Sequence, residues 1–140
     1  MKCNFYTPYY KAGNEVIFME NPVQAGFPSP ADDFKADKIS LDLALVKNKE
    51  TTFYARIKGE SMIDADMDEG DILVIDRSLE PANGKIAVCM IDGQFTVKQI
   101  KIDKDCLWLM PYNKKYQPIK VTEENDFMVW GIVTYIIKQV

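Results

Sequence analysis

The sequence contains no histidine among its 140 residues. This absence excludes a Ser-His-Asp triad, a Cys-His pair, histidine metal ligands and a histidine proton shuttle. A hydrolase built from this chain would therefore need a base of another kind. Cysteine is scarce as well, because Cys3, Cys89 and Cys106 are odd in number and widely spaced. Such a set fits free thiols in a reducing compartment better than a disulfide framework.

Long apolar runs and an excess of positive charge are also missing. No segment approaches the roughly 20 consecutive apolar residues of a membrane span, and the first residues lack the apolar block of a signal peptide. We therefore expect a cytoplasmic protein. The 17 basic and 21 acidic residues leave a net charge of −4, so direct tight binding to nucleic acid is not expected.

With 47% hydrophobic residues, the chain is long enough for one domain with a core and an additional arm. Prolines and glycines interrupt residues 1–30 so often that no long regular element is expected there. The aromatic residues of this arm favour docking on a surface over a free tail. Ser29-Pro30 predicts the start of a helical turn, and Ser40 is predicted to cap a second turn from Leu41 to Val46.

From about residue 51 the sequence takes on the period of β-strands, with Phe53, Ala55 and Ile57 alternating with polar residues. The dipeptides Asn83-Gly84 and Asp92-Gly93 tolerate the positive φ angles of tight hairpin turns. The fold class predicted is mainly β: a curled, antiparallel, barrel-like sheet with short helices and an N-terminal arm. Further strands are predicted at residues 72–76, 85–91, 95–102, 107–110 and 127–137.

The first candidate site residue is Ser61, in the run Gly59-Glu60-Ser61-Met62 at the end of a predicted strand. A glycine two residues before a serine lets the chain turn sharply and present the hydroxyl and nearby backbone N–H groups to a cleft. The competing interpretation is a serine in a surface turn, which is the commoner outcome for so short a motif.

The second candidate is Lys98, which strand alternation places on the same face as Ile100 and Ile102. A lysine on an apolar face would be partly desolvated, and desolvation lowers its pKa from the ordinary value of about 10.4. It could then serve as a neutral base. The competing interpretation is an exposed lysine whose stem covers Ile100.

These residues belong to a longer pattern that resembles the protease domain of the LexA/UmuD family. The matching segments are Gly59-Glu60-Ser61-Met62, residues 69–76, 84–87, 92–98 and 109–113, and Trp130-Gly131-Ile132-Val133. The resemblance covers nearly all of the chain from residue 22 onward. Matches in register over this length are far more specific than either short motif alone.

The resemblance implies a self-cleaving serine peptidase. Ser61 would be the nucleophile, Lys98 its general base, and the backbone amides of Glu60 and Ser61 the oxyanion donors. The family cleaves itself at an Ala-Gly or Cys-Gly bond ahead of the domain, which here is Ala25-Gly26. Residues 1–25 would be the arm removed by self-cleavage, and residues 26–140 the protease domain.

The resemblance is strongest to UmuD-like accessory proteins. Only 25 residues precede Gly26, too few for the DNA-binding domain that LexA-type repressors carry there. It implies a homodimer whose cleavage is stimulated by a RecA filament on single-stranded DNA. The trimmed form would then act as accessory subunit of a Y-family, UmuC-like DNA polymerase in error-prone translesion synthesis during the SOS response. We expect no cofactor and no metal.

Other interpretations of the sequence are a calcium site, a signal peptidase and a non-catalytic subunit. Asp64, Asp66 and Asp68 resemble the start of a calcium loop, but Glu69 and Ile75 stand where that loop requires glycine and glutamate. A signal peptidase also uses serine and lysine, but it needs a membrane anchor. The alternative that stays open is a non-catalytic interaction subunit of the same fold, with a vestigial or rarely used Ser-Lys pair.

Overall fold

The computed structural model describes residues 2–8, 16–19 and 36–140. The chain divides into two compact units, one formed by Met1–Pro8 with Asn48–Val140 and the other by Tyr9–Lys47. The turn predicted at Ser29-Pro30 and the Ala25-Gly26 bond lie outside the described residues.

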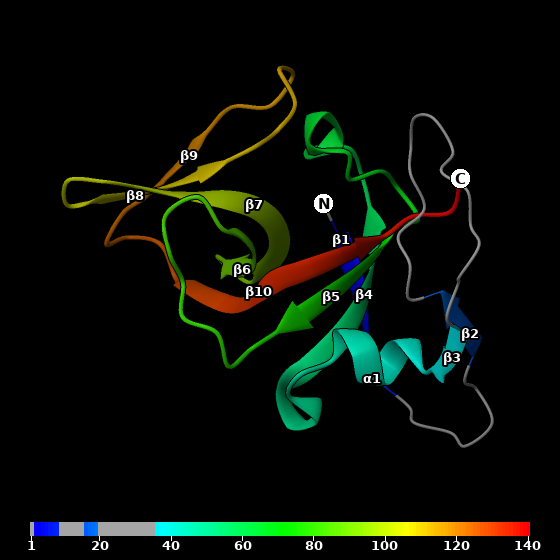
Figure 1. Ribbon diagram of the computed structural model, residues 1–140. Helices are drawn as coiled ribbons and strands as arrows, with labels where there is room; N and C mark the ends of the chain where they lie inside the picture. Colours follow the sequence, from blue (N-terminus) through cyan, green and yellow to red (C-terminus); the bar gives the residue numbers. More distant parts are fainter. Residues whose placement is uncertain (1, 9–15, 20–35) are drawn as a thin grey trace. The chain divides into compact units, whose positions relative to one another are not determined.

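The larger unit is built on one eight-stranded sheet, whose order is β1-β4-β5-β10-β6-β7-β8-β9 (Figure 1). Every pair of neighbouring strands in it is antiparallel. Two 3-10 turns, η1 (Lys49–Thr51) and η2 (Ile63–Ala65), flank β4. The strands are β1 (Lys2–Tyr6), β4 (Thr52–Lys58), β5 (Ile72–Asp76), β6 (Ile86–Ile91), β7 (Gln94–Asp103), β8 (Cys106–Met110), β9 (Ile119–Val121) and β10 (Phe127–Ile137).

The sheet is open, because β1 and β9 stand at its two ends, but it is strongly curled. The curl brings β1 against β7, although three other strands separate the pair β1-β4 from β7 in the sheet order. The Phe5 and Phe95 rings meet there, with centroids 4.9 Å apart. The predicted mainly β, antiparallel and curled fold is therefore confirmed.

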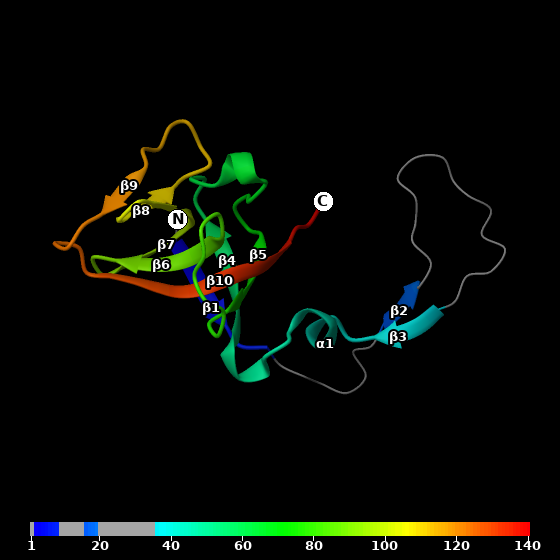
Figure 2. The ribbon, with the colours of Figure 1, turned by 60° about the vertical axis from the view of Figure 1, so that its left-hand side comes forward.

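The smaller unit has one two-stranded antiparallel sheet, formed by β2 (Val16–Met19) and β3 (Ala36–Ile39), followed by helix α1 (Leu41–Leu45) (Figure 2). Ser40 is the N-cap residue, as predicted, but its side chain makes no capping hydrogen bond; its carbonyl accepts the first intrahelical bond, from Ala44 N at 2.9 Å. Within the described part of the chain, no helix is long and apolar enough to cross a membrane.

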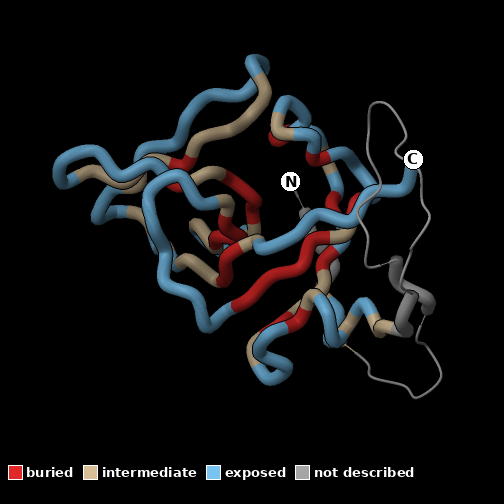
Figure 3. Tube along the Cα trace, in the orientation of Figure 1, coloured by how far each residue is buried: buried red, intermediate tan, exposed pale blue. Residues whose placement is uncertain are grey.

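Burial is concentrated on the central strands β5, β6 and β7 (Figure 3). On β6 and β7, successive residues are buried, so these strands are covered on both faces of the sheet. Val88 faces Val97 across the two strands, and Ala87 faces Lys98 on the opposite face. A polar group on either face of these strands is therefore kept from water.

The predicted strands at residues 72–76 and 127–137 match β5 and β10 to the residue. The hairpin at Asp92-Gly93 is also confirmed, since φ is 49° at Asp92 and 80° at Gly93 between the paired strands β6 and β7. The hairpin prediction for Asn83-Gly84 is wrong. β5 and β6 do not pair with each other but flank β10, and this turn instead attaches to β7, with Gly84 N donating to Ile100 O at 2.8 Å.

Asp76 fastens the end of β5 to the segment that leads into β4. Its carboxylate accepts hydrogen bonds from Thr51 Oγ1 at 2.8 Å, Asn48 Nδ2 at 3.0 Å and both the Oγ and N of Ser78. Burial alone would raise the pKa of this carboxyl, but the hydrogen bonds from Ser78, Asn48 and Thr51 outweigh burial and lower it. The ionised form is therefore the one that the fold stabilises.

We predict that Asp76→Ala destabilises the protein by about 1–3 kcal/mol at pH 7, because charged hydrogen bonds are lost. A lowered folded-state pKa contributes stability above the unfolded value of about 3.9, and this contribution disappears as pH falls through the folded pKa. The difference in urea midpoint between parent and variant should therefore shrink below about pH 4. Asp103→Ala, at an exposed position, is the control. If the difference in urea midpoint between the parent and Asp76→Ala stayed constant down to pH 2, this explanation would be wrong.

Candidate active site

Ser61 lies in the loop that leaves the end of β4. Gly59 begins this loop with a φ of 103°, a left-handed conformation that favours glycine, as the sequence predicted. Two fully buried methionines, Met62 and Met67, anchor the loop in the core. Ser61 itself is only 1% exposed. The hydroxyl is thus held in the interior and does not lie in a surface turn.

Backbone hydrogen bonds fix both ends of this loop. Ile57 N donates to Asp71 O at 2.8 Å, and Gly70 N donates to Ile57 O at 2.9 Å, so the loop closes on the strand from which it leaves. Tyr112 N donates to Ser61 O at 2.9 Å, and Asn113 Nδ2 donates to Glu60 O at 2.8 Å. Because peptide units are planar, holding these two carbonyls also sets the direction of the N–H groups that follow them.

A salt bridge ties the far end of the loop to the C-terminal segment. Lys138 Nζ lies 2.6 Å from Asp68 Oδ2 and 2.5 Å from Asp71 Oδ2. Hydrogen bonds and charge from these two carboxylates raise the pKa of Lys138. Since Asp71 is buried and also accepts from Asp68 N at 2.9 Å, this contact positions the loop that carries Ser61.

Lys98 lies near the middle of β7 and is 5% exposed, so the predicted burial of this lysine is confirmed. Its cross-strand neighbour on β6 is Ala87, a small residue that leaves room for the lysine stem. Cys89, Ile100 and Leu109 belong to the apolar cluster on this side of the strands. Ile102, predicted to share the apolar face, is 48% exposed, so burial ends before it.

The fold brings the two sequence-predicted side chains together. Lys98 Nζ donates a hydrogen bond to Ser61 Oγ at 3.0 Å, between residues that are 37 positions apart in the chain. Both groups are buried. This distance is within the range in which a proton can pass between a nucleophile and its base.

Sequence reasoning missed a third residue, Thr96. Lys98 Nζ donates to Thr96 Oγ1 at 2.7 Å and to Val97 O at 3.2 Å. Thr96 is 8% exposed and lies two residues before Lys98 on the same strand, so both side chains point to one face. The two-residue spacing was the signal available in the sequence, since a threonine at that position can hold a buried amine in place.

A family model described as "Peptidase S24-like" matches residues 17–134 of the chain. The chain belongs to the peptidase S24-like family. The match includes residues 17–19 of β2, the Ser61 loop and all of β4 to β9. The resemblance to the LexA/UmuD family on sequence motifs is therefore confirmed.

Individual proteins that are similar to this chain in sequence include MucA, ImpA and a LexA repressor. The chain is similar to Protein MucA of Salmonella typhimurium, with 35% identity over 87% of this chain and 84% of the relative. It is similar to Protein ImpA of the same species, with 34% identity over 81% of this chain and 77% of that protein. The LexA repressor of Stenotrophomonas maltophilia is 34% identical over 83% of this chain, which corresponds to 54% of the repressor.

The remaining predicted site residues stay predictions. The Ala25-Gly26 bond lies outside the described residues. The amides of Glu60 and Ser61 belong to the fixed loop. Across residues 2–8, 16–19 and 36–140, no group of three acidic, cysteine or histidine side chains could hold a metal ion.

Two described cysteines of this S24-like protein differ sharply in environment. Cys106 is partly exposed, whereas Cys89 is fully buried beside the Lys98 site. Burial raises the pKa of the Cys89 thiol to about 12, although the nearby Lys98 acts in the opposite direction. Because the thiolate is the reactive form, Cys89 is chemically inert in the folded protein.

We predict that iodoacetamide at pH 8 modifies Cys106 in the native protein and leaves Cys89 unmodified, because the Cys89 thiol is both buried and protonated. Peptide mapping of a Cys3→Ser variant measures the two sites separately. Labelling in urea is the control and should modify both. Equal labelling rates for Cys89 and Cys106 under native conditions would contradict the buried, protonated thiol.

Proposed function

We propose that this chain is a self-cleaving serine peptidase that hydrolyses its own Ala25-Gly26 bond, with Ser61 as nucleophile and Lys98 as general base. The observation that carries the proposal is the buried 3.0 Å hydrogen bond between Lys98 Nζ and Ser61 Oγ. Membership of the peptidase S24-like family supports the same reaction class.

In the proposed reaction, Ser61 Oγ attacks the carbonyl carbon of Ala25 while its proton moves to Lys98 Nζ. The negative oxygen that forms is held by the backbone amides of Glu60 and Ser61. The C–N bond then breaks, and Lys98 returns the proton to the nitrogen of Gly26, which leaves as a new N-terminus. Water hydrolyses the remaining ester, which releases the Ala25 carboxyl group and restores Ser61.

The base must be a neutral amine, since an ammonium has three donors and no acceptor. The contacts of Lys98 are compatible with that form. In the neutral form, two N–H groups would donate to Thr96 Oγ1 and Val97 O. The Ser61 hydroxyl would then donate to the nitrogen lone pair, which reverses the direction of the 3.0 Å bond made by the charged amine. Burial of the group favours the same form, because desolvation penalises the charged state.

The small side chains at the Ala25-Gly26 bond suit a nucleophile that is recessed in the protein. Ser61 is 1% exposed, so a substrate carbonyl must come close to the backbone of the Ser61 loop. Alanine and glycine offer little steric hindrance to this approach. The sequence around the bond therefore fits the buried position of the hydroxyl.

The biological role that we propose is that of a UmuD-like accessory protein. The supporting observations are the similarity to MucA, ImpA and LexA and the S24-like match. In this role the protein is a cytoplasmic homodimer, a RecA filament on single-stranded DNA stimulates its cleavage, and the product that begins at Gly26 joins a Y-family DNA polymerase in translesion synthesis.

We predict that Ser61→Ala abolishes formation of the fragment that begins at Gly26 and leaves the fold intact, because only the nucleophilic oxygen is removed. The purified protein is incubated at alkaline pH, and N-termini are mapped by mass spectrometry. Ser40→Ala is the matched control and should cleave like the parent, since Ser40 makes no side-chain capping bond. A parent chain that never yields this fragment, with or without a RecA filament, would favour the non-catalytic interaction subunit.

We predict that Lys98→Met also abolishes cleavage but leaves the free energy of unfolding at pH 7 equal or higher, because methionine has similar length and needs no hydration. A lysine that is neutral when folded and charged when unfolded makes stability rise with pH up to about 10.4. The parent should therefore gain stability relative to Lys98→Met between pH 7 and 10, and its cleavage rate should rise over the same interval.

Denaturant midpoints and single-turnover cleavage rates from pH 6 to 10 measure both quantities. Lys101→Met, an exposed substitution on the same strand, should change neither. A Lys98→Met variant that lost several kcal/mol, about the cost of breaking a buried ion pair, would identify Lys98 as an ordinary charged lysine. Ser61 would then have no base.

A further inference from the structure

The N-terminal strand is an integral part of the main sheet. β1 pairs with β4 at five successive positions, from Lys2 opposite Lys58 to Tyr6 opposite Tyr54. It stands at the end of the sheet, so β4 is its sole hydrogen-bonded neighbour in the sheet order. Without β1, the outer backbone groups of β4 would be left unpaired at an edge.

Phe5 and Tyr6, at the end of β1, lie on opposite faces of the sheet. Phe5 lies opposite Ala55 and packs against the core, with its ring centroid 4.6 Å from that of Trp130 and 4.9 Å from that of Phe95. The small side chain of Ala55 leaves the room that Phe5 occupies. Phe5 therefore fits into a slot formed by residues far away in the sequence.

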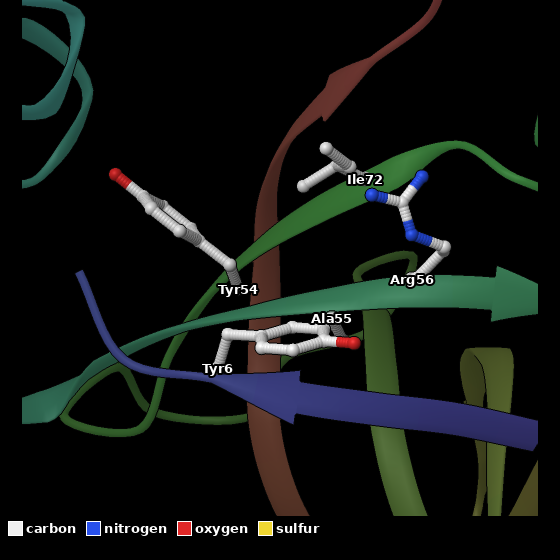
Figure 4. Close-up of a pocket in the computed structure, with 5 residues that line it drawn as sticks. All are labelled: Tyr6, Tyr54, Ala55, Arg56 and Ile72. Atoms are coloured by element: carbon white, nitrogen blue, oxygen red, sulfur yellow. The ribbon is translucent and has the colours of Figure 1, made fainter. Parts of the chain in front are cut away.

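On the other face, Tyr6 borders a cavity of about 210 Å³ with Tyr54, Ala55, Arg56 and Ile72. Figure 4 shows the Tyr6 ring lying along β4 beside Ala55. The side chain of Tyr54 projects from β4, and that of Ile72 projects from β5. Since Tyr6 is 54% exposed, it contributes less buried area than Phe5. We therefore expect the outer edge of β4 to select a strand by the aromatic side chain at the position of Phe5.

A second strand ahead of Gly26 is also paired with a strand behind it. β2 (Val16–Met19) is hydrogen-bonded to β3 (Ala36–Ile39) in the smaller unit. The two strands described within residues 1–25 therefore have their partners in residues 26–140. Hydrolysis of the Ala25-Gly26 bond removes none of these pairings, and two linked contacts hold a segment better than either contact does alone.

We propose that the outer edge of β4 is a binding site for an extended peptide segment with an inward aromatic residue, and that Lys2–Tyr6 remains bound there after the chain is cut. This inference rests on the proposed function only in that self-cleavage supplies the cut. The product of the reaction is then a complex of fragments 1–25 and 26–140. The β4 edge becomes available to another extended strand only when fragment 1–25 dissociates.

The test uses two full-length chains, so that failure of self-cleavage does not decide it. One is the parent, cut by its own site. The other is a Ser61→Ala chain with the recognition sequence of a site-specific protease inserted between Ala25 and Gly26. Denaturing gels measure the cut, and size exclusion with native mass spectrometry measures retention. Hydrogen exchange of residues 52–58 reports on the β4 edge.

We expect fragment 1–25 to elute with fragment 26–140 at about 50 µM, and exchange of residues 52–58 to stay within about threefold of the uncut chain. Phe5→Ala should accelerate this exchange at least tenfold in the cut chain, because the strand is then held by fewer contacts. Thr7→Ala, an exposed position just beyond β1, is the matched control and should behave like the parent.

Separation of the fragments under native conditions would overturn the proposal. So would fast exchange of residues 52–58 after the cut, or a Phe5→Ala chain that keeps full protection. Failure of the parent to cut itself would count against the proposed function alone, because the inserted site still tests the edge of β4.

Discussion

The proposed chemistry depends on one hydrogen bond between two buried side chains, Lys98 and Ser61, and the rest of the structure holds these two groups in place. Neither residue is reactive in water: a solvated lysine is protonated near neutral pH, and a solvated serine hydroxyl is a weak nucleophile. The fold removes both groups from solvent and brings them to 3.0 Å. In a chain without histidine, a desolvated lysine can take the part of the base that activates a serine.

The curled sheet and the Ser61 loop supply this pair from opposite sides. β7 is a central strand covered on both faces, and it holds Lys98 with Thr96 as a fixed hydrogen-bond partner. The loop after β4 is closed on its own strand, anchored by Met62 and tied through Asp71 to Lys138. Rigid support on both sides matters because an error of about 1 Å between nucleophile and base can reduce the rate a hundredfold.

The edge of this sheet is formed by the N-terminal strand β1. In the proposed reaction, the cut at Ala25-Gly26 separates β1 covalently from the rest of the sheet. Phe5 packs against Phe95 and Trp130, so β1 contributes to the core although it lies ahead of the cleaved bond. Peptide hydrolysis changes covalent continuity without changing these contacts. If the chain cuts itself as proposed, hydrolysis and dissociation of the N-terminal fragment are two separate events, because β1 and β2 are paired with β4 and β3.

The sequence alone determined the fold class, the strands β5 and β10 and the hairpin at Asp92-Gly93, because hydrophobic period and turn residues are local properties. The pair Ser61 and Lys98 was predicted from the resemblance to the LexA/UmuD family, since neither short motif identifies it alone. Sequence reasoning missed β1, β2, β3 and β9, because strands of three to five residues are too short for a period to stand out, and it wrongly made a hairpin of Asn83-Gly84. Only the tertiary structure decided that β10 separates β5 from β6, that Thr96 holds the Lys98 amine, and that Phe5 reaches Trp130. These contacts join residues whose neighbourhood is set by strand order and sheet curl, and neither is encoded in any short segment of the chain.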